Sequence, residues 1–177
     1  RAFAGTVYRA VCEGTRLFCQ APTGTGKTIS ALFPALKAMG EGKTTQVFYL
    51  TAKTISRRNA ADALEQMRRC GMRLKTVTLT AKEKICFQDE CECSPLSCPY
   101  ADGYYDRVND TLYQLLQDHD HLTREAVEEA ARRDRVCPFE LALDASLWCD
   151  AIICDYNYLF DPVVYLRRFF SEPGEYT

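Results

Sequence analysis

The fold of this chain is decided by one stretch near its amino terminus, Ala21-Pro22-Thr23-Gly24-Thr25-Gly26-Lys27-Thr28. It follows a short apolar segment, residues 16–20, which we expect to be a buried strand. It opens residues 28–39, which have the pattern of a helix ended by Gly40. A loop between a strand and a helix directs several backbone N–H groups and the helix dipole to one place, where they bind phosphate. The stretch therefore predicts a nucleotide phosphate-binding loop.

Each residue type in the loop suits this role. Gly24 and Gly26 lack a Cβ, so the backbone can curl closely around phosphate oxygens. Lys27 would reach the β- and γ-phosphates of ATP, and the Thr28 hydroxyl would take one ligand position of Mg²⁺. Within this sequence only these last two are expected to act in catalysis. The residues predicted to bind ATP and Mg²⁺ are Thr23, Gly24, Thr25, Gly26, Lys27 and Thr28. The plain alternative is a Gly- and Thr-rich turn without a function.

Strand and helix patterns continue after the loop. Residues 46–50 form a second apolar run, and residues 59–70 form an amphipathic segment closed by Gly71. Residues 74–79 are rich in β-branched side chains, as strands are. Strands that alternate with helices are typical of a parallel sheet covered by helices. The sequence therefore predicts an α/β fold with a parallel sheet flanked by helices.

The alternation breaks between residues 84 and 140. Cysteines, acidic residues and two polar helical segments, residues 104–117 and 124–135, fill this stretch, and Thr123 suits the N-cap of the second segment. Residues 151–154 then resume the buried-strand pattern. The sequence predicts a main domain interrupted by a small, mostly helical insertion. The expected divisions are residues 1–83 for the first part of the main domain, 84–140 for the insertion and 141–177 for the return to the main domain.

Composition limits the classes of protein that fit. The 177 residues include 22 Lys and Arg against 24 Asp and Glu, so the net charge neither requires nor excludes a nucleic-acid partner. With 47% hydrophobic residues, the chain can bury one main core. The sequence contains no apolar run of about 18 residues that could span a membrane and no secretory signal. We expect a soluble, cytoplasmic protein without a membrane partner.

Ten cysteines fall into two sets. A secreted disulfide scaffold does not fit a phosphate loop and a large apolar core, so the thiols are expected to be free or bound to metal. The first set lies in apolar or helical contexts, where cysteine is most often a small core residue. Its members are Cys12, Cys19, Cys70, Cys149 and Cys154. The second set lies in the insertion and comprises Cys86, Cys91, Cys93, Cys98 and Cys137.

Four cysteines of the insertion are the predicted metal ligands. Cys98 and Cys137 each precede a proline, which suits the first position of a helix, so each cysteine would cap a helix whose dipole favours the thiolate. We select Cys86, Cys93, Cys98 and Cys137, separated by six, four and thirty-eight residues, with Cys91 as a spare. Four thiolates serve either a tetrahedral Zn²⁺ or a [4Fe–4S] cluster. The wide spacing favours the cluster over zinc, and unliganded thiols fit poorly with so acidic a surrounding.

Several motifs occur in the order of a known family. They are the phosphate loop, FYLTAKT (residues 48–54), Cys-Pro-Tyr (98–100), Cys-Pro-Phe-Glu-Leu (137–141) and DYNYLFDP (155–162). Together they resemble the XPD/DinG family of superfamily 2 iron–sulfur DNA helicases, in particular its bacterial DinG-like branch. The phosphate loop begins with Ala21 where glycine is common, a variant associated with helicases rather than GTPases. The resemblance covers essentially the whole chain.

The resemblance implies the RecA-like first motor domain of an ATP-dependent 5′→3′ DNA helicase, a class of enzyme used in DNA repair. It also implies a [4Fe–4S] cluster near the point where the strands of a duplex part. Thr51, Lys53 and Thr54 match the family's motif Ia, which touches the backbone of single-stranded DNA, and hydroxyl and ammonium groups at a strand end suit phosphate contacts. An ordinary strand-to-helix turn is the alternative. The implied partners are ATP, single-stranded or forked DNA, and a second motor domain.

One motif of such motors does not occur in this sequence. They need an Asp-Glu pair after a later strand to hold Mg²⁺ and position the attacking water, and no D-E-A-H or equivalent is present. We therefore expect a fragment, truncated before this motif, that by itself hydrolyses little ATP. Two other functions stay open at this point. One is a P-loop kinase or other NTPase with a structural zinc module, and the other is a non-catalytic module that docks a partner protein.

Overall fold

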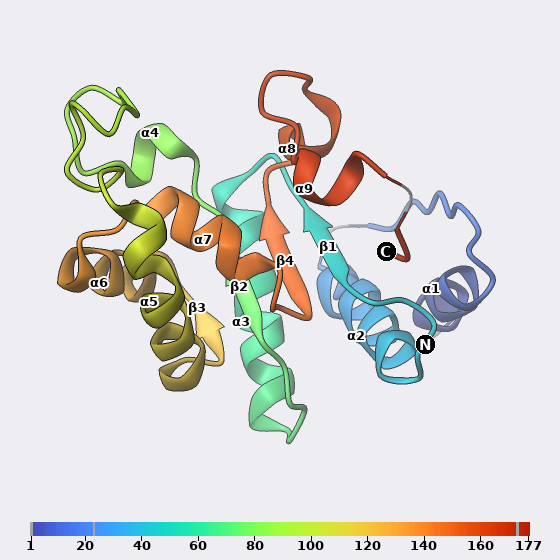
Figure 1. Cartoon of the computed structure of the whole chain (residues 1–177). Helices are drawn as coiled ribbons and strands as arrows, with labels where there is room; N and C mark the ends of the chain where they lie inside the picture. Colours follow the sequence, from blue (N-terminus) through green and yellow to red (C-terminus); the bar gives the residue numbers. More distant parts are fainter. Residues whose placement is uncertain (1, 23, 173) are drawn as a thin grey trace. The chain divides into compact units, whose positions relative to one another are not determined.

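The structure, a computed structural model, describes residues 2–22, 24–172 and 174–177. The chain forms two units (Figure 1). The first unit comprises Arg1–Arg73 with Asp150–Thr177, and the second unit comprises Leu74–Cys149. The predicted insertion, residues 84–140, falls within the range of the second unit.

The first unit combines helices with two of the strands. Its elements are α1 (Ala2–Cys12), α2 (Lys27–Gly40), β1 (Val47–Leu50), α3 (Thr54–Arg69), β4 (Ala151–Cys154), α8 (Asn157–Phe160) and α9 (Arg167–Phe170). The helices predicted at residues 28–39 and 59–70 are confirmed as α2 and α3. The second of them begins earlier than predicted, at Thr54, because its first turn is polar and carries no apolar period to mark it.

The two strands of the first unit are parallel. Val47 lies opposite Ala151, and Leu50 lies opposite Cys154. All four residues of β4 are buried, as expected of a strand covered on both faces. The helices α2 and α3 pack against each other and supply much of the core (Figure 1). Their buried residues are Leu32, Pro34, Ala35, Leu36, Ala38, Ala60, Ala63, Leu64 and Met67.

The end of the chain lies along the other edge of β1. The N–H of Thr45 donates to the carbonyl of Glu175 at 2.8 Å, and the N–H of Thr177 donates to the carbonyl of Gln46 at 3.0 Å. The bridge between these segments is parallel. Their association is supported by an aromatic cluster in which the ring centroid of Phe48 lies 5.1, 4.9 and 5.6 Å from those of Phe169, Phe170 and Tyr176.

The strand predicted at residues 16–20 is wrong. None of these residues belongs to a strand, and the side chain of Phe18 is 92% exposed. A strand is stable only when a neighbouring strand pairs with its N–H and C=O groups. Within the described residues no strand pairs with this segment, so its apolar side chains stay at the surface.

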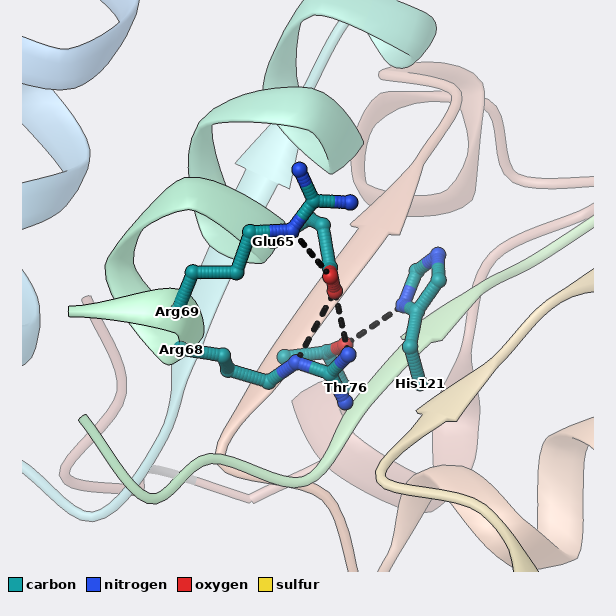
Figure 2. A network of polar contacts seen from close by, with 5 residues as sticks. All are labelled: Glu65, Arg68, Arg69, Thr76 and His121. Atoms are coloured by element: carbon teal, nitrogen blue, oxygen red, sulfur yellow. Dashed lines mark hydrogen bonds and ion pairs between the residues drawn. The ribbon is translucent and has the colours of Figure 1, made fainter. Parts of the chain in front are cut away.

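The second unit contains two short parallel strands and four helices among its described residues. These elements are β2 (Thr76–Thr78), α4 (Lys82–Ile85), α5 (Tyr104–Asp118), β3 (His121–Leu122), α6 (Arg124–Asp134) and α7 (Pro138–Ser146). Val77 lies opposite Leu122 in the strand pair. Beside it, the hydroxyl of Thr76 lies 2.6 Å from Nδ1 of His121 (Figure 2). The strand predicted at residues 74–79 is confirmed in its central part.

Both helices predicted in the insertion are confirmed. The segments at residues 104–117 and 124–135 correspond to α5 and α6. The hydroxyl of Thr123 accepts a hydrogen bond from the N–H of Ala126 at 3.2 Å, so the predicted N-cap of α6 is formed. Among the helices of the described residues, none has the length and apolar character needed to cross a lipid bilayer.

The cysteines predicted to lie in the core divide into two groups. Cys149 and Cys154 are buried, and Cys12 is half-buried. Cys19 and Cys70 are exposed, so the prediction is wrong for these two. Cys19 belongs to the segment that does not form a strand, and Cys70 follows the last turn of α3, where the helix no longer shields it.

Candidate functional site

The phosphate loop leads directly into α2. Gly24 and Gly26 have φ angles of 79° and 71°, a left-handed conformation that a side chain disfavours. The helix begins at Lys27, so its first turn carries N–H groups that have no partner within the helix. Thr28 follows and is half-buried. Thr23, which the sequence predicts to bind ATP, lies outside the described residues.

The Lys27 ammonium group lies inside the curl of its own loop. It donates hydrogen bonds to the carbonyls of Ala21 and Pro22, each at 2.8 Å. The hydroxyl of Thr25 also donates to the Pro22 carbonyl at 2.8 Å. The side chain of Lys27 is exposed, and a flexible ammonium group can exchange such carbonyls for stronger acceptors such as phosphate oxygens.

The segment predicted to contact DNA lies where β1 ends and α3 begins. The N–H of Thr51 donates to the carbonyl of Cys154 at 3.0 Å, and the N–H of Lys53 donates to the Thr51 hydroxyl at 3.3 Å. Lys53 is the N-cap residue of α3, and Thr54 is its first residue. Both side chains are exposed. An ammonium group and a hydroxyl beside a helix N-terminus form a positive surface that suits phosphate.

An ion pair supports this edge of the first unit. Nη2 of Arg57 lies 2.9 Å from Oδ2 of Asp155, joining α3 to the residue after β4. The two side chains are only 18% and 25% exposed. Sequence reasoning assigned Arg57 no role, because nothing local to α3 indicates a partner so distant in the chain.

The four predicted ligand cysteines line one cavity of the second unit, with a volume of about 250 Å³. They are Cys86, Cys93, Cys98 and Cys137. The spare, Cys91, is not among the lining residues. Side chains that sequence reasoning did not select also line the cavity, among them Lys82, Phe87, Tyr100 and Tyr104.

Side chains can line one cavity without lying close enough together to bind one metal ion. Within the described part of the chain, no three His, Cys, Asp or Glu side chains form a group that could hold a metal ion. A tetrahedral zinc site needs its sulfur atoms about 3.8 Å apart, given Zn–S distances of about 2.3 Å. The ligand role of the four cysteines therefore stays a prediction.

Two of these cysteines are predicted to cap a helix, and one of them does so. Cys137 is the N-cap residue of α7 with Pro138 at the first position, as predicted. Pro99 does not begin a helix, so the prediction for Cys98 is wrong. Residues 99–103 are turns, and α5 starts only after Gly103, whose φ of 59° interrupts a helix.

Polar contacts differ among the thiols. Burial raises the pKa of Cys137, although the N–H groups of Glu140 and Phe139 act in the opposite direction. A hydrogen bond with Cys93 raises the pKa of the Lys82 ammonium group. The cavity thus places the Lys82 ammonium group beside one of its sulfur atoms.

The cavity wall includes an aromatic pair, and a cation lies over one of the two rings. The rings of Phe87 and Tyr100 meet edge to face with centroids 5.0 Å apart. The guanidinium group of Arg132 lies 4.1 Å from the Phe87 centroid. The position of Phe87 and Tyr100 close to Cys86 and Cys98 in the sequence could have indicated this wall, whereas Arg132 gives no such signal.

Models of protein families match both parts of the chain. The DEAD/DEAH box helicase model matches residues 2–94. A second model, DEAD_2, matches residues 72–171. A comparison with curated proteins gives no match.

Two solved structures share the fold. An XPD helicase has a TM-score of 0.64 and 19% identity, and the match covers 100% of this chain and 31% of that chain. A truncated XPD has a TM-score of 0.63 and 18% identity, and the match covers 96% of this chain and 48% of that chain. This chain therefore spans less than half the length of either structure. The likeness confirms the predicted RecA-like α/β fold class.

Each family model covers more than half of the 177 residues. A predicted membership in the bacterial DinG-like branch is finer than these matches and stays a prediction. The chain belongs to the DEAD/DEAH box helicase family and to the family described by the DEAD_2 model.

Proposed function

We propose that the chain is the first motor segment of an ATP-dependent DNA helicase that moves 5′→3′ along single-stranded DNA. The observation that carries the proposal is the phosphate loop, where two glycines with positive φ lead directly into α2 at Lys27. Membership of a helicase family supports ATP and Mg²⁺ as the ligands. The activity belongs to the whole protein, in which a second motor domain would complete the ATP site.

Nucleotide binding would use groups that the loop already presents. The N–H groups at the start of α2 and the helix dipole would hold the phosphates of ATP. The Lys27 ammonium group would leave the carbonyls of Ala21 and Pro22 for the β- and γ-phosphates. The hydroxyl of Thr28 would be a ligand of Mg²⁺. Binding would then draw the two motor domains together, and hydrolysis would release them.

Single-stranded DNA would bind at the start of α3. Lys53 and Thr54 present an ammonium group and a hydroxyl to solvent beside a helix N-terminus, and the half-buried Thr51 precedes them where β1 ends. Such groups bind phosphate oxygens without reading base sequence. The ion pair of Arg57 with Asp155 would keep this surface rigid as the motor opens and closes.

The size of the cysteine cavity and its four thiols support the proposal of an inorganic centre of several atoms. Its volume of about 250 Å³ is much larger than the roughly 30 Å³ of one water molecule. Four thiols are the donor set of a [4Fe–4S] cluster, and Cys86, Cys93, Cys98 and Cys137 would hold it. Such a cluster supplies a rigid cross-link among segments far apart in the sequence. The insertion would then keep a fixed shape where the duplex strands separate.

ATP hydrolysis by the full-length protein tests the motor. We expect hydrolysis that is stimulated by single-stranded DNA and abolished in the Lys27→Ala variant. Hydrolysis without a response to DNA would favour a P-loop kinase or another NTPase. Failure of the full-length protein to bind ATP would favour a non-catalytic module that docks a partner protein.

Metal analysis of anaerobically purified full-length protein tests the centre. We expect iron and acid-labile sulfide with visible absorbance, and we expect both to be lost in the Cys98→Ser variant. Cys70→Ser is the matched control, because Cys70 is an exposed thiol of the first unit, and it should retain the absorbance. Zinc in place of iron would contradict the cluster and would favour a structural zinc module.

A further inference from the structure

We propose that Arg107 is a positioning residue whose guanidinium group holds the turn of Cys98 and the segment before Cys137 at a fixed separation. These two thiols would then be in place before the metal centre binds. The inference rests on the proposed function, because it concerns the same four-cysteine cavity. Arg107 contacts neither sulfur directly and would act through the backbone that carries them.

The hydrogen bonds of Arg107 join two distant segments. Its Nη2 donates to the carbonyl of Asp102 and, at 2.9 Å, to the carbonyl of Arg135. Arg135 lies two residues before Cys137 in the sequence. A guanidinium group is planar and permanently charged, so it fixes the direction of the carbonyls that it contacts more firmly than an ammonium group does.

The first of these segments is a closed turn that carries Cys98. The N–H groups of Ala101 and Asp102 both donate to the carbonyl of Cys98, at 3.0 and 3.1 Å. The carbonyl of Asp102 therefore has a fixed relation to the buried Cys98 thiol. When Arg107 holds that carbonyl, it holds the whole turn.

The backbone conformation on both sides suits this contact. Gly103 has a φ of 59°, and a Cβ built there would lie 2.7 Å from Nη1 of Arg107. Glycine thus leaves the space that the guanidinium group fills. Arg135 has a φ of 54°, an unfavourable conformation for a residue with a side chain, and its carbonyl is the one that Arg107 holds.

A second link supports the same two elements. The hydroxyl of Tyr104 in the first turn of α5 donates to Oδ2 of Asp144 in α7 at 2.7 Å. Burial and the contact with Asp144 raise the pKa of Tyr104 well above its ordinary value, so the hydroxyl stays a donor at neutral pH. The helices that follow Cys98 and Cys137 are therefore joined as well.

The other two ligand positions have links of their own: Nη2 of Arg124 donates to the carbonyl of Lys84, two residues before Cys86, at 2.6 Å, and Lys82 makes a hydrogen bond with Cys93. Cys86 and Cys93 lie on a stretch between α4 and α5, and Cys93 is exposed. The thiol of Cys93 contacts the carbonyl of Cys91 at 3.7 Å, within the same stretch. Arg107 and Tyr104 thus act on the Cys98 and Cys137 side of the cavity, and their effect is distinct from that of the contacts at Cys86 and Cys93.

The test measures how fast a ferrous-iron chelator bleaches the visible absorbance of the anaerobic full-length protein. We expect Arg107→Ala and Gly103→Ala to bleach at least about tenfold faster than the natural sequence, because removal of outer-shell residues of metal sites weakens metal binding by about 10- to 100-fold. Arg107→Lys keeps the charge but loses the planar fork. Its bleaching rate should lie between that of Arg107→Ala and that of the natural sequence. If Arg107→Ala does not fold, the lysine variant decides the question.

A matched control separates positioning from general stability. The Lys75 ammonium group donates to the carbonyls of Leu116 and His119 at the other end of α5, far along the helix from Arg107. Lys75→Ala should lower the unfolding temperature as Arg107→Ala does, but it should leave the bleaching rate unchanged. Equal bleaching of these two variants, or bleaching of Arg107→Ala at the natural rate, overturns the positioning role. A natural protein without iron or visible absorbance overturns the proposed centre and this inference with it.

Discussion

Lys27 is the residue on which nucleotide binding should depend most. Charge-assisted hydrogen bonds contribute about 1.5–3 kcal/mol each, so Lys27→Ala in the full-length protein should weaken ATP binding by roughly 10- to 100-fold. Titration with a fluorescent ATP analogue measures this change. Lys43→Ala is the control, because Lys43 is an exposed lysine beyond the end of α2. Equal affinity of the two variants would contradict the assignment of the loop.

A second prediction for a single residue concerns Glu65 and the dependence of stability on pH. Its carboxylate accepts hydrogen bonds from Arg68 and Arg69 (Figure 2), and these lower the pKa of Glu65. Because its pKa is lower in the folded state, Glu65 stabilises the folded protein at pH values above its ordinary pKa of about 4.3. This stabilisation is lost as the pH falls through the folded-state pKa. Glu65→Gln should therefore lower the unfolding temperature at pH 7 but not in strong acid. Thermal unfolding across pH, with the exposed Glu13→Gln as control, measures the difference, and a deficit that is constant with pH would refute it.

At the scale of elements, α6 depends on its N-cap. The hydroxyl of Thr123 accepts the N–H of Ala126, so Thr123→Ala should destabilise the protein by about 1 kcal/mol. Thr123→Ser keeps the capping oxygen, so it should lower the free energy of unfolding by only a few tenths of a kcal/mol. Urea unfolding measures both, and equal losses in the two variants would show that the methyl group rather than the cap matters.

The elements also show what a sequence can predict. Signals that act over one or two turns, such as Thr123 before α6 or Pro138 at the start of α7, predicted helices that the structure contains. Residues 16–20 have the composition of a strand, but a strand requires a partner that composition does not reveal. The helix predicted to begin at Pro99 does not form, because Gly103 adopts a left-handed conformation that overrides the local preference of proline. The crowding of cysteines in the insertion and the Cys-Pro pairs predicted the four cysteines that line one cavity, but their distances depend on the packing of segments far apart in the sequence.

At the scale of the whole molecule, the chain is expected to bind nucleotide without turning it over. The sequence contains the phosphate loop but no D-E-A-H or equivalent motif after a later strand to position an attacking water. Residues 1–177 alone should therefore show ATP binding with no hydrolysis above background, measured by phosphate release. Turnover by this chain that Lys27→Ala abolishes would mean that another group positions the water.

Strand separation by the full-length protein tests the central claim most directly. A forked DNA duplex whose only long single-stranded tail has a 5′ end should be unwound when ATP and Mg²⁺ are present, and the Lys27→Ala variant should leave it paired. The same duplex with a 3′ tail should be unwound far more slowly. If the protein hydrolyses ATP in the presence of single-stranded DNA but separates neither duplex, it is not the helicase proposed.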